Sequence, residues 1–282
     1  MFGKVLKEAL RRRLRQHNRT AAPDERFPVD ELRARQALHE RSPLDMHARI
    51  LYGGARVEGT GLLDLFNACV DESATQVSPW KALARIQGAM NLAHYFLHSL
   101  SLEGARAECG VFQGLSALYV CRVAALKRQD FTGADFHLID SFEGFPEPRS
   151  EDFITVNRGK NGAVRAPAFQ QGDAAASLEH VRRVLRDFPG VHFHPGFIPN
   201  ILSCLPETHW AFVHIDVDLH HPTLESLEYF YPRMVQDGIV ICDDYGSDLF
   251  PGARKAWDRY CNGHGIPFVV LETGQSVIVR KV

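Results

Sequence analysis

The fold of this chain is decided by the stretch Phe212-Val213-His214-Ile215-Asp216-Val217-Asp218, an apolar segment that ends in two acids. Side chains two residues apart in a β-strand point to the same face, so Asp216 and Asp218 are expected side by side. A second apolar run, Gly238-Ile239-Val240-Ile241-Cys242-Asp243-Asp244, follows a helical pattern at 224–234. A strand, a helix and a strand of this length form a right-handed crossover between parallel strands. We therefore expect four aspartates at one edge of a parallel sheet.

Outward from this unit, short apolar segments alternate with helical patterns through the C-terminal two-thirds of the chain. This alternation predicts an α/β fold with a doubly wound sheet. The expected strands lie near 105–109, 136–140, 191–194, 211–216 and 239–243. The expected helices lie near 114–126, 177–186, 224–234 and 252–261. A turn at 272–275, between apolar runs at 267–271 and 276–280, predicts a terminal antiparallel hairpin.

The first hundred residues are mostly helical in pattern and predict an N-terminal helical cap, 1–100. The helical patterns lie at 32–39, 62–70 and 79–100, and residues 18–30 have the composition of a linker or lid. Residues 1–15 form a basic amphipathic pattern. Such a helix can lie on an anionic membrane surface, or it can dock on its own protein or on a second subunit of a homo-oligomer. The sequence leaves these alternatives open.

The composition indicates an ordinary globular chain. Its 282 residues are 45% hydrophobic, with a formal net charge of −2, so the chain can bury a full core and has no global charge that favours nucleic acid. We therefore expect a small-molecule partner. Six scattered cysteines without C-x-x-C spacing, and no secretory apolar region, predict free thiols in a reducing cytoplasm. No run of about 20 apolar residues is present.

The first expected strand leads into Glu108-Cys109-Gly110-Val111-Phe112-Gln113-Gly114, where glycines at a strand-to-helix turn let a ligand approach the backbone. The dinucleotide fingerprint requires a glycine where Phe112 stands, so a pyrophosphate ligand is excluded. S-adenosylmethionine (SAM) has no pyrophosphate and suits this turn.

The second strand ends in Asp140, whose carboxylate is expected to accept hydrogen bonds from both ribose hydroxyls of the cofactor. The alternative is that Asp140 only caps the next turn, through the amides of Phe142 and Glu143. The third strand leads to Gly196-Phe197, which the topology places near the adenine.

The four aspartates at one sheet edge require a positive partner. Two carboxylates about 4 Å apart repel by roughly 4 kcal/mol at an effective dielectric near 20. The nearest basic residues in the sequence, Arg233 and Arg254, are expected on helices. An all-oxygen cluster suits a hard divalent ion such as Mg²⁺. The alternative is that these acids are unrelated loop caps.

Five motifs follow one another between about residues 85 and 261: Glu108-Cys109-Gly110-Val111-Phe112-Gln113-Gly114, Ile139-Asp140-Ser141-Phe142-Glu143-Gly144-Phe145, Gly196-Phe197, His214-Ile215-Asp216-Val217-Asp218-Leu219 and Asp243-Asp244-Tyr245-Gly246. In this order they resemble the macrocin O-methyltransferase family, which includes sugar O-methyltransferases of macrolide and aminocoumarin antibiotic pathways. The resemblance implies a class I, Rossmann-like methyltransferase domain at 101–282 that uses SAM and Mg²⁺ on the hydroxyl of a sugar or glycoside.

The resemblance also implies roles for single residues. Asp218 would be the general base on the acceptor hydroxyl. The implied metal ligands are Asp216, Asp243 and Asp244. The residues expected to bind SAM are Glu108, Gly110, Gly114, Asp140, Ser141, Gly196 and Phe197. One departure from the pattern is His220-His221-Pro222-Thr223, where a tyrosine and small polar residues are expected. Either histidine could shape the acceptor pocket or share the base role, and either could instead lie at the surface.

Two other classes of protein stay open at this point. A non-catalytic SAM-binding or sugar-binding accessory protein would use the same cofactor turn, with residues 1–15 as its docking element. A metal-dependent hydrolase would use the same acids but would leave Asp140 and the 108–114 turn without a role. The acceptor itself is expected to contact the first hundred residues and the segment 147–169, which could form a lid.

Overall fold

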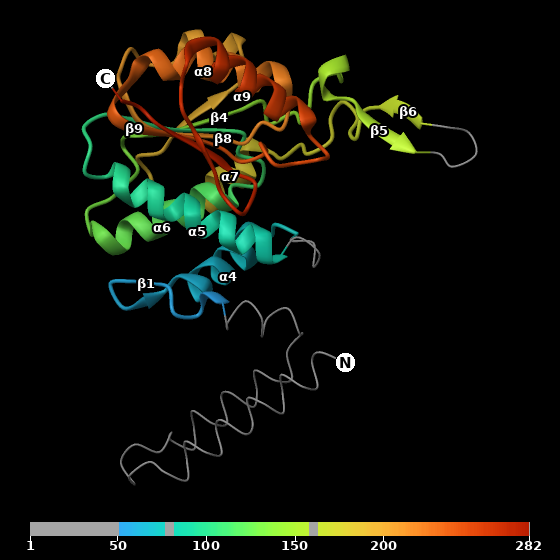
Figure 1. The fold of residues 1–282 in the computed structure, drawn as a ribbon. Coiled ribbons are helices and arrows are strands. Elements are labelled where there is room, and N and C mark those ends of the chain that lie inside the picture. Colours follow the sequence, from blue (N-terminus) through green and yellow to red (C-terminus); the bar gives the residue numbers. More distant parts are fainter. Residues whose placement is uncertain (1–50, 77–81, 158–162, 282) are drawn as a thin grey trace, which may run out of the picture. The chain divides into compact units, whose positions relative to one another are not determined.

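The computed structural model describes residues 51–76, 82–157 and 163–281 (Figure 1). The chain from Tyr52 onward forms one compact unit. The predicted features at 1–15, 18–30 and 32–39, and the first residues of the helix expected at 79–100, lie outside the described residues. In the part of the chain that the structure describes, no helix has the length and apolarity needed to cross a membrane.

A seven-stranded sheet forms the centre of this unit, in the order β10-β11-β9-β8-β3-β4-β7. The strands from β9 to β7 are parallel, whereas β11 is antiparallel to β9 and pairs with β10 in a hairpin. Their bounds are Ala105–Cys109 (β3), Phe136–Asp140 (β4), His192–Pro195 (β7), Trp210–Ile215 (β8), Met234–Cys242 (β9), Val269–Val270 (β10) and Ser276–Val279 (β11). The predicted doubly wound sheet and its terminal antiparallel hairpin are confirmed.

The register of the sheet determines which residues meet at its edge. Cys109 pairs with both Ile139 and Ile215, and Ile215 pairs with Cys242. The residues that follow these positions therefore leave the sheet together. The amide of Asp216 donates to the carbonyl of Cys109 over 2.8 Å, which ties the ends of β8 and β3. The carboxyl ends of the parallel strands thus bring the glycine turn and the acids to one edge, as in other open α/β sheets.

Helices cover both faces of the sheet (Figure 1). Helix α5 packs on β8 and β9 and contacts α6, and α4 also contacts α6, whereas α8 and α9 pack together on the opposite face. Their bounds are Leu62–Ser73 (α4), Ala82–Ser99 (α5), Leu115–Lys127 (α6), Leu178–Val184 (α7), His220–Phe230 (α8) and Pro251–His264 (α9). Helices α4 and α5, which the sequence placed in the cap, therefore share a core with the sheet. The extent of a cap over 1–100 stays a prediction.

A bulge in β8 gives each face of the sheet its own aromatic contact. Trp210 and Phe212 pair with Ala105 and Arg106, which are successive residues of β3, so β8 has one extra residue there and the two aromatic residues face opposite sides. The ring of Phe212 meets that of Phe96 from α5 at 5.3 Å between centroids, and the ring of Trp210 meets that of Phe230 from α8 at 5.0 Å. All four side chains are buried. The strand that ends at the acids is therefore held by packing on both sides.

The helix predicted at 224–234 was wrong at both ends. Helix α8 begins at His220 and ends at Phe230, followed by a 3-10 turn at Tyr231–Arg233, and β9 already begins at Met234. Pro232 explains the early end, because its nitrogen cannot donate to an α-helical carbonyl. The early start depends on a distant residue: the amide of His220 donates to Oδ1 of Asp152 over 2.7 Å.

Two small hairpins were not predicted. One pairs β1 (Arg56–Val57) with β2 (Thr60–Gly61). The other pairs β5 (Ile154–Asn157) with β6 (Ala163–Ala166) within the segment predicted as a lid. All six cysteines are free.

Candidate active site

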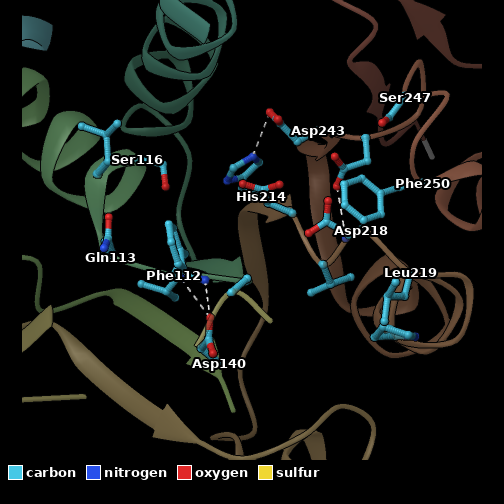
Figure 2. Close-up of a pocket in the computed structure, with 18 of the residues that line it drawn as sticks. Phe112, Gln113, Ser116, Asp140, His214, Asp218, Leu219, Asp243, Ser247 and Phe250 are labelled. Atoms are coloured by element: carbon cyan, nitrogen blue, oxygen red, sulfur yellow. Dashed lines mark hydrogen bonds and ion pairs between the residues drawn. The ribbon is translucent and has the colours of Figure 1, made fainter. Parts of the chain in front are cut away.

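A cavity of about 600 Å³ lies at the carboxyl ends of the parallel strands (Figure 2). Its walls come from the β3–α6 turn, the ends of β4, β8 and β9, helix α5 and the turn of the terminal hairpin. The two halves of the site predicted from the sequence, the glycine turn and the acids, both line this one cavity. A volume of this size is typical of a small-molecule site.

The glycine turn depends on the absence of a side chain at Gly110. Its φ is +85°, and a Cβ atom there would lie 1.8 Å from the carbonyl oxygen of Asp216. Gly114 has a different role: with φ of +84° it is the N-cap residue before α6, and a Cβ atom there would lie 3.1 Å from Cγ1 of Val181 in α7. Gly110 therefore allows β3 and β8 to approach each other, whereas Gly114 allows α6 and α7 to pack.

Asp140 holds the same turn from the end of β4. Its Oδ2 accepts hydrogen bonds from the amides of Phe112 at 3.0 Å (Figure 2) and Val111 at 2.6 Å. Its Oδ1 accepts from the amide of Phe142 at 2.7 Å. The amide of Glu143 donates instead to Oγ of Ser141. The capping bond to Phe142 considered from the sequence is thus present. A carboxylate offers about four acceptor sites, so one stays available on the cavity side.

Glu108 lies outside the lining of the cavity, and its role in SAM binding stays a prediction. The side chain is 1% exposed, and neither it nor Gly114 belongs to the cavity lining in the described structure. Its Oε1 accepts from Oγ of Ser116 at 2.5 Å, and its Oε2 lies 3.9 Å from Nδ1 of His214. Glu108 therefore lies behind the cavity wall, between the cofactor half and the acid half. The other predicted cofactor residues line the cavity: Gly110, Asp140, Ser141, Gly196 and Phe197.

The structure brings three of the acids into one cluster. Carboxylate oxygens of Asp216, Asp243 and Asp244, one from each residue, all lie within 4.8 Å of one another. Asp218 lines the same cavity, and its amide donates to Oδ2 of Asp244 over 3.1 Å. Its backbone is left-handed, with φ of +59°. Figure 2 shows Asp218 and Asp243 apart from Asp140 and Phe112.

The charges in this cluster oppose one another. Burial raises the pKa of Asp216 well above its usual value, and the charge of Asp243 adds to this effect. Burial likewise raises the pKa of Asp244, with further contributions from the neighbouring carboxylates. Three carboxylates at this spacing are stable together in ionised form only beside a cation. Because all the donors are carboxylate oxygens, the cluster fits a hard divalent ion.

Asp243 differs from its neighbours because two donors contact it. Nε2 of Gln275 donates to its Oδ1 over 2.7 Å, and Nε2 of His214 lies 3.4 Å from the same oxygen. Burial acts to raise the pKa of Asp243, but these hydrogen bonds and the charge of His214 outweigh burial and lower it. Burial acts to lower the pKa of His214, yet its contact with Asp243 and the nearby charge of Glu108 raise it.

The two histidines considered as alternative bases lie outside the lining of this cavity. His220 begins α8, and burial lowers its pKa. Nδ1 of His221 lies 3.6 Å from Oε1 of Glu225 on the same helix. Neither histidine is among the residues that line the 600 Å³ cavity. His221 instead lines a neighbouring cavity of about 560 Å³, whose wall shares Leu219 and Pro222 with the first.

Several residues that line the cavity were missed from the sequence. They are Arg85, Gln113, Ser116, Phe145, Phe250 and Gln275. The rings of Phe145 and Phe250 lie 5.9 Å apart and form an apolar wall near the acids. Arg85 is an arginine of the lining whose charge contributes to the lowered pKa of Asp243 and acts against the raised pKa of Asp216. The sequence pattern of α5, a buried helical face, contained no signal for Arg85.

Comparison with solved structures shows that other proteins share this fold. The structure of the O-methyltransferase NovP is 22% identical, covers 71% of this chain and 81% of its own, and superposes with a TM-score of 0.53. The calicheamicin methyltransferase CalS11 is 19% identical, covers 77% of this chain and 91% of its own, with a TM-score of 0.56. The protein therefore has the fold of the class I SAM-dependent methyltransferases.

The family follows from the sequence comparison. The family model Macrocin-O-methyltransferase (TylF) matches residues 84–279, and the chain belongs to this family. The 8-demethyl-8-(2,3-dimethoxy-alpha-L-rhamnosyl)-tetracenomycin-C 4'-O-methyltransferase of Streptomyces olivaceus is 31% identical over 61% of this chain and 63% of its own length. The demethyldecarbamoylnovobiocin O-methyltransferase of Streptomyces niveus is 27% identical over 57% and 59%. The chain thus spans about three-fifths of the length of these relatives.

Proposed function

We propose that this protein is a SAM-dependent O-methyltransferase that methylates a hydroxyl group of a sugar or glycoside with the help of Mg²⁺. The observation that carries the proposal is the single cavity lined by both the Asp140-bound glycine turn and the acid cluster. Membership of the macrocin O-methyltransferase family supports it. So does the name of the Streptomyces olivaceus relative, which gives a rhamnosyl compound as its acceptor.

Asp216, Asp243 and Asp244 would hold the metal ion, since they form the all-oxygen cluster that the cavity contains. A divalent ion bound there would lower the pKa of an acceptor hydroxyl placed against it. These acids are half-buried, so water would screen the electrostatic interaction less than it does at an exposed surface.

Asp218 would act as the general base. It lines the same cavity, and the bond from its amide to Asp244 holds its backbone next to the metal ligands. Its carboxylate would take the proton of the acceptor hydroxyl while the acceptor oxygen bonds to the methyl carbon of SAM and the carbon–sulfur bond breaks. The products are a methyl ether and S-adenosylhomocysteine, and the proton stays on Asp218 until it is released to water. General base catalysis of this kind is worth about 10²–10⁴-fold in rate.

The cofactor would occupy the other half of the cavity. Asp140 and Ser141 stand at the end of β4, where a ribose can bond to the remaining acceptor site of Asp140. Gly196 and Phe197 follow β7 and would contact the adenine, and Gly110 leaves room for the methionine part against the backbone. In this arrangement the residues that would hold the cofactor and those that would hold the acceptor line one cavity, as in-line methyl transfer requires.

Turnover of the full chain tests the proposal. The protein would be incubated with SAM, MgCl₂ and a panel of glycosides and phenols, and release of S-adenosylhomocysteine measured with and without EDTA. We expect release with at least one glycoside, and its loss in EDTA. A protein that binds SAM but methylates none of the panel would support the accessory-protein alternative. Failure to bind SAM would overturn the methyltransferase proposal.

None of the residues assigned to the site falls within 1–15, so we propose that this segment acts in membrane contact or in homo-oligomer formation. Removing them should leave turnover of a small acceptor nearly unchanged. Vesicle sedimentation and size-exclusion chromatography with light scattering would separate the two roles, since only one predicts a change in molecular mass.

A further inference from the structure

The turn of the terminal hairpin reaches the acid cluster through one side chain, Gln275. This side chain is 2% exposed, and it lines the cavity beside Asp243. Its Nε2 donates to Oδ1 of Asp243 over 2.7 Å and to the carbonyl of Gly88 in α5 over 3.3 Å. Its Oε1 accepts from Nδ2 of Asn91 at 3.1 Å and from Oγ1 of Thr273 at 2.9 Å.

These four bonds use the whole hydrogen-bonding capacity of a primary amide, which has two donors and two acceptor sites. They also determine its orientation. With the amide reversed, Oε1 would face the carboxylate of Asp243 and the carbonyl of Gly88, which are both acceptors. Gln275 is thus held with its donor end toward Asp243. The contact links α5, the terminal hairpin and the end of β9 at one point of the cavity wall.

We propose that Gln275 is a positioning residue that orients the carboxylate of Asp243 for metal binding; this inference rests on the metal site of the proposed function. A neutral donor suits this task. A lysine in its place would compete with the cation for the carboxylate, and a glutamate would add to the repulsion among the acids. An amide fixes one oxygen of Asp243 without adding charge. Residues that orient metal ligands from behind contribute about 10–100-fold to metal affinity.

A purely structural role for Gln275 makes a different prediction. If it only attached the hairpin to α5, then breaking the Asn91 bond should have the same consequences as removing Gln275. Asn91 contacts Gln275 and Thr273 and is not among the residues that line the cavity in the described structure. Asn91→Leu is therefore the matched control for Gln275→Met, which preserves the length of the side chain and removes both donors.

The test measures metal binding directly on the full chain. Mn²⁺ would be titrated into wild type, Gln275→Met, Asn91→Leu and Asp243→Asn, with the free ion followed by electron paramagnetic resonance. We expect Gln275→Met to raise the Kd for Mn²⁺ about 10–100-fold and Asn91→Leu to leave it within about threefold. The affinity for S-adenosylhomocysteine without metal should be equal in both variants. In turnover assays, added Mg²⁺ should restore the kcat of Gln275→Met.

The outcomes separate this inference from the proposed function. If wild type binds Mn²⁺ and Asp243→Asn does not, while Gln275→Met binds as wild type does, the positioning role is wrong and the metal site stands. Equal losses of Mn²⁺ affinity in Gln275→Met and Asn91→Leu would also overturn the positioning role, and would indicate that Gln275 only attaches the hairpin to α5. If wild type binds no divalent ion, the metal site fails and the inference fails with it. Gln275→Leu replaces Gln275→Met if that variant does not fold, as judged by circular dichroism.

Discussion

The backbone of Gly110 lies so close to that of Asp216 that a Cβ atom on Gly110 would stand 1.8 Å from the Asp216 carbonyl oxygen. Gly110 belongs to the turn that would receive the cofactor, and Asp216 belongs to the acid cluster. The close approach of these two residues therefore sets the distance between the two halves of the site. Any side chain at position 110 would push β3 and β8 apart where the chemistry is proposed to take place.

Gly110→Ala should consequently destabilise the fold and abolish cofactor binding. The new methyl group would clash with backbone, and the residue would also need a left-handed conformation, so we expect a loss of at least about 3 kcal/mol. Thermal denaturation and calorimetry with SAM would measure both effects. Gly263→Ala is the control, because Gly263 lies in α9 with open space around it and should gain about 0.5–1 kcal/mol. A Gly110→Ala protein that melts and binds SAM as wild type does would contradict this account.

The acids should divide into ligands and base. Asp216→Asn, Asp243→Asn and Asp244→Asn should each raise the Mg²⁺ concentration needed for half-maximal turnover, because each loses a charged ligand. Asp218→Asn should instead lower kcat by about 10²–10⁴-fold while it binds metal and SAM normally, without recovery at high Mg²⁺. Rescue of Asp218→Asn by added metal would show that Asp218 is a ligand. If turnover by the wild type were insensitive to EDTA, both the metal-ligand role of the three acids and the base role of Asp218 would be contradicted.

Asp140→Ala should weaken SAM binding about 10–100-fold, since a charged acceptor is worth roughly 1.5–3 kcal/mol. Part of this loss would come from the turn itself, whose amides at Val111 and Phe112 would lose their acceptor. Isothermal titration with SAM measures the change. Asp130→Asn, an exposed acid away from the cavity, should bind SAM normally. Undiminished affinity in Asp140→Ala would exclude Asp140 from the cofactor site.

A stack of histidines at the β4–β7 edge should make stability depend on pH. Nδ1 of His137 lies 2.9 Å from Nε2 of His194, and the ring of His192 stacks on His137 at 4.7 Å. Burial, together with the charges of both neighbours, lowers the pKa of His137 to about 4. The unfolded chain keeps the ordinary value of about 6.5, so it binds more protons than the folded chain between these two pH values. The free energy of unfolding should therefore fall as the pH is lowered from about 6.5 to about 4.

Urea denaturation at pH 7 and pH 5 would measure this dependence. His137 is 7% exposed, so solvent screens its contribution little. Between pH 7 and pH 5, the free energy of unfolding of the wild type should fall by about 2 kcal/mol more than that of His137→Phe. Equal losses in the two proteins would show that His137 does not cause the pH dependence.

Asp152 should stabilise the start of α8 from outside that helix. Its Oδ1 accepts from the amide of His220 at 2.7 Å, and Leu219, the N-cap residue, makes no side-chain cap bond. Asp152→Ala should cost about 1–2 kcal/mol, the usual value of a lost cap. Asp152→Asn preserves an acceptor oxygen and should recover most of that loss. Chemical denaturation of both variants tests the role, and equal destabilisation would argue against a cap.

The sequence by itself determined the sheet and the meeting of the acids. A strand, a helix and a strand in succession require a crossover between parallel strands. Because the two strands end at paired residues, the residues that follow them, Asp216 and Asp243, leave the sheet at the same edge. The periodicity of the apolar residues and the spacing of the acids predict these features, because the features depend on local conformation and on the handedness of the connection between strands. The same logic placed Asp140 at the end of β4.

Only the tertiary structure decided which side chains face the cavity. Glu108 lies on the strand as predicted, yet it turns toward Ser116 and His214 behind the wall. Gln275 reaches Asp243 from 32 positions away, and Asp152 caps a helix that begins 68 positions later. The pattern of apolar and polar residues in the sequence cannot predict such contacts, because a hydrogen bond between distant segments depends on how the helices and the hairpin pack on the sheet. Packing therefore selects the residues that line the site and orient its acids, from the larger set that the sequence brings to the edge.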